Sequence, residues 1–196
     1  MMWYNQITMI KLIYVTGNKL KVAAAKKCME NFDVEIVQKD IDVPEIQADT
    51  NEEVANFSSK YASEILKEDC VKNDGGLVIP ALNGFPGPYA KYVEQTINEQ
   101  GILDLMVNKT DRTAYWVEAW SYTEYGKDPV CFVGKFYGSI STEKRGENGY
   151  GYDKVFIPEG KDKTLAEMEE EEKLLYWCSS AHKELIDHIK KAKGIE

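Results

Sequence analysis

The chain has 196 residues, of which 43% are hydrophobic and 29% charged, a composition that favours a folded core over a chain that is disordered as a whole. The formal net charge of -9 argues against broad binding of a nucleic-acid polymer, which needs an excess of Lys and Arg on one face. No apolar run approaches membrane-spanning length and Met1 to Thr8 lack a secretory pattern, so we expect a cytoplasmic protein with no membrane partner.

Length and composition predict a single domain over residues 1–196. Residues 1–8 would be an extension if translation began at Met9 rather than at Met1. The cysteines lack metal-type spacing, and a chain of this size does not need disulfides to hold a core. We therefore expect reduced thiols at all four positions, Cys28, Cys70, Cys131 and Cys178.

An apolar run, Leu12 to Val15, leads directly into Thr16-Gly17-Asn18-Lys19-Leu20-Lys21, a pattern typical of a strand that delivers a phosphate-binding turn to a helix. Glycine lets the backbone approach a bulky anion, the N–H groups of a helix start face that anion, and lysine adds a mobile positive charge. An ordinary Gly-Asn turn between a strand and a helix has the same pattern, so the turn alone leaves both interpretations open. The helix is expected over residues 19–30.

The middle of the chain alternates between short apolar runs and helical periods. Its predicted elements are a strand at 34–37, a loop at 42–45, a helix at 51–66, an apolar strand at 77–79, and a turn at 83–88 that feeds a helix from near Tyr89.

Aromatic and β-branched residues then predict an antiparallel hairpin of Thr113 to Tyr122 with Val130 to Ile140. A turn at 148–152 leads into a short strand at 155–157. The segment 165–193 is expected to be helical, with an apolar stripe at Leu174, Cys178, Ala181, Leu185 and Ile189.

Several segments, taken in order, resemble the inosine triphosphate pyrophosphatase family, whose members hydrolyse aberrant purine nucleoside triphosphates such as ITP, dITP and XTP. The resemblance covers Lys11 to Met168. Its motifs are Thr16-Gly17-Asn18-Lys19-Leu20-Lys21, Pro44-Glu45, Asp74, the segment from Ala81 to Lys91 with its Pro-Gly-Pro-Tyr, Gly149-Tyr150-Gly151-Tyr152-Asp153, and Thr164-Leu165-Ala166-Glu167-Met168.

The resemblance implies an α/β fold with a long, twisted mixed β-sheet flanked by helices, and two lobes with the active-site cleft between them. It implies hydrolysis of the α-β phosphate bond to give NMP and pyrophosphate, with Mg²⁺ as the cofactor. It also implies a homodimer. The aromatic stretch from Ala114 to Trp120 offers an apolar interface, although core packing explains Trp116 and Trp120 equally well.

At the phosphate end, resemblance and chemistry together assign Lys21 and Lys91 to clamping phosphate oxygens, with Thr16, Gly17 and Asn18 in the loop that receives them. Asp74 is the expected water-activating carboxylate and is helped by the metal. Glu45 is the expected second metal ligand. Either carboxylate has an alternative as a turn or capping residue, which is a common role for an Asp beside Gly75-Gly76.

At the base end, the resemblance places Tyr150 and Tyr152 as rings that stack on the purine, and Asp153 as a reader of a base edge. Two packed tyrosines in a turn are the alternative. Base discrimination falls to the family's Ser-His-Arg and an upstream lysine. The counterparts here are His182, Lys183 and Lys173.

The match is altered at this end of the site. Ala181-His182-Lys183 replaces Ser-His-Arg, and Lys173 lies nine residues before His182 rather than five, a difference of about one helical turn. A lysine lacks the planar fork of arginine, so we expect an altered or relaxed base preference. Ala24 also replaces a family glutamate. These changes leave open another nucleotide substrate, or a non-catalytic nucleotide-binding or regulatory protein.

Overall fold

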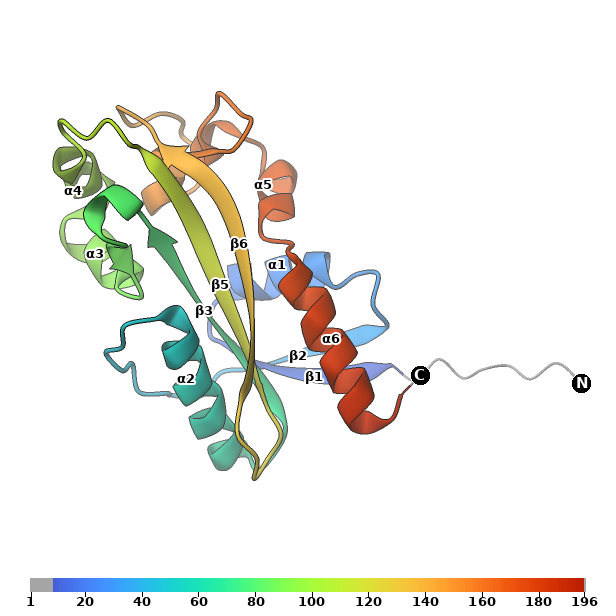
Figure 1. Cartoon of the computed structure of the whole chain (residues 1–196). Helices are drawn as coiled ribbons and strands as arrows, with labels where there is room; N and C mark the ends of the chain where they lie inside the picture. Colours follow the sequence, from blue (N-terminus) through green and yellow to red (C-terminus); the bar gives the residue numbers. More distant parts are fainter. Residues whose placement is uncertain (1–8, 196) are drawn as a thin grey trace, which may run out of the picture.

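A computed structural model describes residues 9–195, so the alternative starts at Met1 and Met9 concern a segment, residues 1–8, outside the described part. Within that part, a seven-stranded mixed sheet forms the centre of the molecule, with strand order β2-β1-β3-β5-β6-β7 and β4 paired to β3 (Figure 1). The strands are β1 (Ile10–Val15), β2 (Val34–Lys39), β3 (Cys70–Val78), β4 (Pro86–Gly87), β5 (Thr113–Thr123), β6 (Val130–Ile140) and β7 (Phe156–Pro158).

Helices flank this sheet on both sides, as the sequence predicts. The α-helices are α1 (Lys19–Cys28), α2 (Asn51–Leu66), α3 (Ala90–Thr96), α4 (Asn98–Leu105), α5 (Glu170–Tyr176) and α6 (Ser180–Lys193), with short 3-10 turns η1 (Pro80–Leu82), η2 (Gly151–Lys154) and η3 (Leu165–Glu167). None of the helices in residues 9–195 combines the length and apolar character needed to cross a bilayer.

The pairing of β1 opens the sheet at the point where the candidate site lies. β1 runs parallel to β2 along its whole length but meets β3 only at Tyr14 and Val71. On its other edge β3 pairs with β5 continuously, from Cys70 with Thr123 to Val78 with Tyr115. Beyond Val71, one edge of β3 is therefore not paired with β1. Side chains of β3 and of the loop after β1 line a common cavity at this edge.

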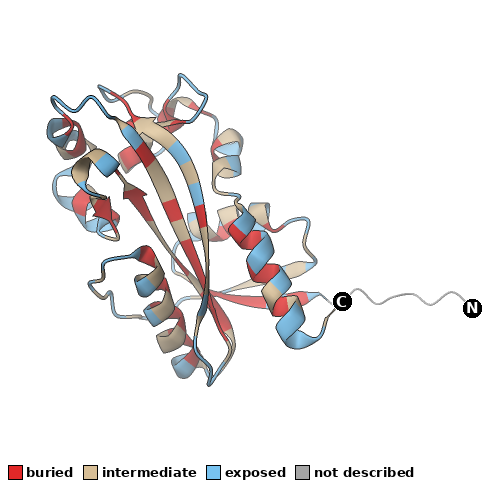
Figure 2. Ribbon diagram, in the orientation of Figure 1, coloured by how far each residue is buried: buried red, intermediate tan, exposed pale blue. Residues whose placement is uncertain are grey.

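Two hydrophobic cores lie at opposite ends of the β5–β6 hairpin (Figure 2). Ala114 and Ile140 belong to the core that α3, α4 and β7 complete, whereas Trp120 and Tyr122 belong to the core that β1, α1 and α6 complete. Each core removes apolar side chains from water, which is the main favourable contribution to folding. The long hairpin therefore connects two halves that the sequence resemblance predicts as lobes.

The tryptophans of β5 pack inside the molecule. Trp120 is fully buried, and the ring of Trp116 contacts those of Phe136, Tyr152 and Trp177. Of the two interpretations of the aromatic stretch, core packing is therefore correct for these side chains, and the interface interpretation is wrong for them.

Most predicted elements are confirmed, and the helix at 51–66 has the predicted bounds. Its start is fixed by a capping box, in which Thr50 accepts from the backbone of Glu53 and the Glu53 carboxylate accepts from the backbone of Thr50. The helical prediction for 165–193 is confirmed in part, because the segment forms η3, α5 and α6 and is not one continuous helix. The backbone leaves helical geometry after Trp177, and Ser179 is the N-cap from which α6 begins.

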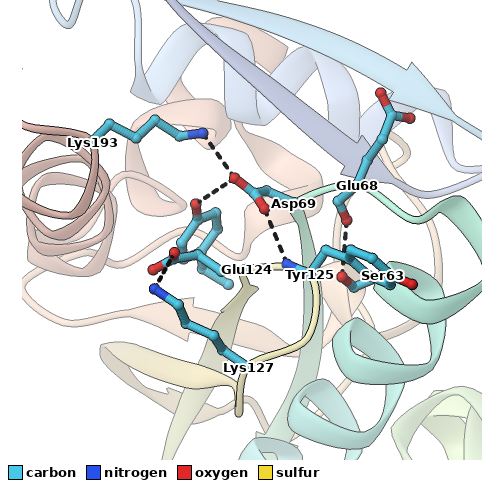
Figure 3. A network of polar contacts seen from close by, with 8 residues as sticks. Ser63, Glu68, Asp69, Glu124, Tyr125, Lys127 and Lys193 are labelled. Atoms are coloured by element: carbon cyan, nitrogen blue, oxygen red, sulfur yellow. Dashed lines mark hydrogen bonds and ion pairs between the residues drawn. The ribbon is translucent and has the colours of Figure 1, made fainter.

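A polar network closes the end of the molecule at which the β5–β6 turn lies (Figure 3). The Asp69 carboxylate accepts from Lys193 Nζ at 2.8 Å, from Tyr122 Oη at 3.2 Å and from the backbone N–H of Tyr125 at 3.0 Å. These donors lower the pKa of Asp69 although burial acts in the opposite direction. The network fastens the end of α6 to the start of β3.

Candidate active site

A cavity of about 1380 Å³ lies between the loop after β1 and residues of α3, η2 and α5. Its lining includes residues of both hydrophobic cores, and the cavity adjoins the edge of β3 that β1 leaves unpaired. Its lining contains twelve of the thirteen residues that the sequence assigns to the site: Thr16, Gly17, Asn18, Lys21, Glu45, Asp74, Lys91, Tyr150, Tyr152, Asp153, Lys173 and His182.

The loop after β1 gives α1 a capped N-terminus that faces the cavity. Asn18 is the N-cap, and its Oδ1 accepts from the backbone N–H groups of Leu20 at 2.9 Å and Lys21 at 3.4 Å. Thr16 Oγ1 accepts from the Asn18 backbone N–H at 3.1 Å. Lys21 lies in the first turn, where the helix dipole and its own ammonium both favour an anion.

Glu45, in the loop after β2, and Lys91, in the first turn of α3, both line the cavity and form an ion pair. Lys91 Nζ donates to Glu45 Oε1 at 2.5 Å, and this hydrogen bond is the main reason that the pKa of Glu45 is lowered. Both side chains are largely exposed, so the pair contributes little to stability. An exposed pair of this kind can separate when phosphate or metal arrives.

Asp74 lies in the interior of β3, opposite Ala119 of β5, and not at an element end as the sequence suggests. The alternative of a turn residue is therefore wrong. Burial raises the pKa of Asp74, while a hydrogen bond from Asn51 and the charges of Lys21 and Lys72 act to lower it. A desolvated carboxylate with a raised pKa is a stronger proton acceptor than an exposed one.

The donor set suits a hard divalent cation, because Glu45 and Asp74 offer only oxygen ligands to the cavity. Within residues 9–195, no three His, Cys, Asp or Glu side chains are grouped closely enough to hold a metal by themselves. The residues therefore fit an ion that takes its remaining ligands from water and substrate phosphates, a mode common for Mg²⁺.

At the base end, the two tyrosines have different environments. The Tyr150 ring is 58% exposed at the cavity wall, which leaves a face available for stacking. Tyr152 is 3% exposed, and its hydroxyl donates to the backbone carbonyl of Ala90 at 2.8 Å. Tyr152 is therefore a packed side chain in the turn, which is the alternative interpretation, although it also belongs to the cavity lining.

Asp153 and Lys173 lie together although twenty residues separate them in the sequence. Lys173 is 5% exposed in α5, with its Nζ at 3.8 Å from Asp153 Oδ2 and 2.7 Å from Glu170 Oε2. Burial raises the pKa of Asp153 to about 6, against the lowering effect of Lys173. The displaced lysine therefore still reaches the cavity beside the predicted reader of the base.

His182 and Lys183 have separate environments on α6. The His182 ring contacts that of Trp120 in a tilted arrangement, with centroids 4.8 Å apart and an interplanar angle of 58°. Its Nδ1 accepts from the Ser179 backbone N–H at 3.3 Å, and burial lowers its pKa. It caps α6 and also lines the cavity. Lys183 does not line the cavity, because it lies on the exposed face of α6 and pairs with Asp187 at 2.5 Å. We therefore do not retain Lys183 as a substrate ligand.

Sequence reasoning missed three features of the cavity. Lys72 and Glu118 are charged side chains that line it from β3 and β5. Both lie inside strands, where an alternating pattern makes a polar residue resemble an ordinary surface position. The third feature is a disulfide between Cys28 of α1 and Cys178 before α6.

The prediction of four reduced thiols is therefore wrong for Cys28 and Cys178, while Cys70 and Cys131 are free. The two bonded cysteines are 150 residues apart in the sequence, so spacing alone gave no sign of the pair. Their Cα atoms are 4.9 Å apart because the 177–179 connection crosses the C-terminal end of α1.

The fold and cavity together define an α/β protein that gathers amines and carboxylates in one cavity. The profile of the Ham1 family matches residues 12–181. A protein of Methanopyrus kandleri named dITP/XTP pyrophosphatase is 42% identical over 174 residues, which cover 89% of this chain and 90% of the relative. A protein of Thermococcus kodakarensis with the same name is 43% identical over 164 residues, 84% of this chain and 88% of the relative.

Solved structures give the same assignment. The Ham1 protein of Staphylococcus aureus has a TM-score of 0.76 and 28% identity, with 93% of this chain and 99% of that chain covered. A HAM1 protein from Coxiella burnetii has a TM-score of 0.78 at 24% identity over 93% of this chain and 100% of that one, and supports the fold. The chain belongs to the Ham1 family.

Proposed function

We propose that this protein is a metal-dependent nucleoside triphosphate pyrophosphatase that converts ITP, dITP or XTP to the monophosphate and pyrophosphate. One observation carries the proposal. A single cavity collects two amines and two carboxylates, Lys21, Lys91, Glu45 and Asp74, and extends to an acidic and aromatic end beside Lys173. The names of the relatives, dITP/XTP pyrophosphatase, support the same substrate class.

Each cavity residue has a role in this reaction. Lys21 and Lys91 neutralise phosphate oxygens, and the N-terminus of α1 with Thr16, Gly17 and Asn18 receives them. Asp74 takes the proton of the water that attacks the α phosphate. Mg²⁺, held by Glu45 and Asp74, would withdraw negative charge from the phosphates when bound.

The base end supplies orientation. Tyr150 stacks on the purine, and the Asp153 carboxylate accepts from a base N–H while Lys173 donates to a base carbonyl. His182 contributes to this wall mainly by holding Trp120 and the start of α6. Lys183, the counterpart of the family's arginine, lies outside the cavity, so no planar fork reads the base, and the proposal includes a relaxed preference among purines.

Release of pyrophosphate and of orthophosphate is measured for ITP, dITP, XTP, ATP, GTP and pyrimidine triphosphates, with and without Mg²⁺. We expect Mg²⁺-dependent release of pyrophosphate, greatest with 6-oxo purines. Asp74→Asn should reduce release by at least about 100-fold, as expected for loss of a general base. Asp162→Asn, on an exposed turn, serves as the matched control and should have no effect.

Other outcomes would reject parts of the proposal. Turnover confined to another nucleotide would change the substrate while leaving the reaction, and tight nucleotide binding without pyrophosphate release would indicate a binding or regulatory protein. A strong preference for ITP and XTP over GTP and ATP would contradict the relaxed selection, and full activity in Asp74→Asn would remove Asp74 from the mechanism.

We also propose a cytoplasmic homodimer. Nucleoside triphosphates are made and used in the cytoplasm, and α3, α4 and the turn after them leave large apolar side chains exposed: Tyr92, Ile97, Leu105 and Val107. Light scattering tests the mass. A monomer at working concentrations would contradict the dimer without affecting the proposed reaction.

A further inference from the structure

Glu118 is a charged side chain on the cavity wall to which the proposed reaction gives no role. It lies in β5, directly opposite Gly75 of β3, next to the Asp74 position. A Cβ on Gly75 would be in ordinary van der Waals contact with Glu118 Oε1, at 3.5 Å, and both residues line the cavity. The Glu118 carboxylate therefore belongs to the part of the cavity wall that β5 and β3 form.

Both oxygens of Glu118 are held by side-chain N–H groups. Trp120 Nε1 donates to Oε2 at 3.1 Å, and Asn73 Nδ2 donates to Oε1 at 3.3 Å. Asn73 Oδ1 in turn accepts from the hydroxyl of Tyr14 at 2.6 Å. This series of hydrogen bonds fixes the carboxylate and links β5 through β3 to Tyr14 of β1. Tyr14 lies two residues before Thr16, where the phosphate loop begins.

The charges around Glu118 come from both catalytic elements. Lys21 of α1 and Asp74 of β3 line the same cavity as Glu118, where Lys21 attracts the Glu118 carboxylate and Asp74 repels it. Burial raises the pKa of Glu118 to about 7, and Lys21 and the Trp120 hydrogen bond act in the opposite direction. Lys21 thus lies in the field of a rigid carboxylate before any phosphate enters the cavity.

We propose that Glu118 is a positioning residue, whose carboxylate directs the Lys21 ammonium across the cavity floor and limits how tightly Lys21 holds a polyphosphate. The consequence for turnover rests on the proposed function, because weaker binding by Lys21 allows pyrophosphate to leave after hydrolysis. Loss of the carboxylate leaves Lys21 without this counter-charge. Phosphate groups then bind more tightly, and product release becomes slower.

This role predicts an effect that a purely structural side chain would not have. Glu118→Gln removes the charge and keeps the size, and should tighten pyrophosphate binding about five- to tenfold, the usual size of one coupled pair. Both KM for the triphosphate and kcat should fall, because binding strengthens while release slows. Simple damage to the fold would weaken binding instead.

Calorimetric titration with pyrophosphate and Mg²⁺ at about pH 8.5, above the Glu118 pKa, measures binding in wild type, Glu118→Gln, Glu118→Asp and Glu184→Gln. Glu118→Asp keeps the charge and should remain within about twofold of wild type. Glu184→Gln, the matched control on the exposed face of α6, should equal wild type. In a Lys21→Met background, Glu118→Gln should produce no further tightening, because the partner of the coupling is absent.

Equal or weaker pyrophosphate binding in folded Glu118→Gln would overturn the proposal, as would the same tightening in the Lys21→Met background. If Glu118→Gln fails to fold, Glu118→Thr, a neutral residue suited to a strand, replaces it with the same expected result. The titration does not require turnover. Absence of catalysis in wild type would therefore reject the proposed function alone, and unchanged binding in Glu118→Gln would reject the role of Glu118 alone.

Discussion

Asn51 Nδ2 donates a hydrogen bond of 2.7 Å to Asp74 Oδ2, which joins the first residue of α2 to the middle of β3. Asn51 is almost fully buried, and a Cβ on Gly76 would come within 2.9 Å of its Nδ2. Gly76, two residues after Asp74 in the strand, therefore lets α2 approach closely enough for this contact. The bond fixes one carboxylate oxygen and leaves the other for a water.

We predict that Asn51→Ala reduces kcat/KM about tenfold at neutral pH, the usual effect of losing one hydrogen bond to a charged group. The hydrogen bond from Asn51 lowers the pKa of Asp74, so its loss should also move the acid limb of the rate profile to higher pH. Gln100→Ala removes a comparable amide–carboxylate bond, to Asp104 at 2.9 Å, outside the cavity and serves as the control. An acid limb at the wild-type position in Asn51→Ala would contradict the prediction.

Lys173 should govern the pH dependence of substrate binding. Ionised Asp153 accepts from a base N–H more strongly than the neutral acid, so KM for ITP should rise as the pH falls through about 6. Lys173 lowers the pKa of Asp153, and Lys173→Met should therefore shift the rise in KM to higher pH, with less effect on kcat. KM profiles for wild type and Lys173→Met test this. Lys161→Met, which removes an exposed pair with Glu172, should leave the profile unchanged.

The Cys28–Cys178 disulfide should stabilise the fold. Cross-linking residues 150 positions apart restricts the unfolded chain, and its loss should lower the free energy of unfolding by about 2 to 5 kcal/mol. Cys28→Ser and Cys178→Ser should each lower Tm to the value that wild type shows in a thiol reductant. Cys131→Ser removes a free thiol and should change Tm little. Tm values that do not respond to reductant would count against the disulfide.

Asp69 should make the fold sensitive to acid. Its pKa is lowered in the folded state, so its stabilising contribution is present above the unfolded value of 3.8 and is lost as the pH falls through the folded value. Asp69→Asn should cost about 1 kcal/mol at neutral pH after screening by solvent, and the difference from wild type should vanish in acid. Urea unfolding measures it. Asp128→Asn, which breaks an exposed pair with Lys60, should cost less.

Local patterns predicted the elements well, because capping and periodicity act over a few residues. The helical period of residues 51–66 predicts α2, and the β-branched and aromatic runs predict the hairpin of β5 and β6. The break between α5 and α6 was missed because the apolar stripe continues across it. Only the packing of 177–179 against α1, with Cys178 in a disulfide, shows why the helix stops there.

Sequence motifs of the family identify those site residues that lie within them. They do not identify a residue that reaches the cavity because of the register between two strands. Lys21 and Asp74 stand in such motifs, and both line the cavity. Glu118 reaches the cavity only because β5 pairs with β3 in a register that sets it opposite Gly75. Lys183 has the sequence position of a ligand but lies on the wrong side of α6, since one residue turns a helix by about 100 degrees.

The β5–β6 hairpin has a mechanical consequence. Its strands, 11 residues each, pass without interruption from one hydrophobic core into the other, so no flexible linker separates the two halves. Rotation of the two halves about a hinge therefore cannot widen or narrow the cavity opening for a nucleotide. The adjustment has to be spread as small torsions along the paired strands, and melting should take both halves apart in one cooperative step.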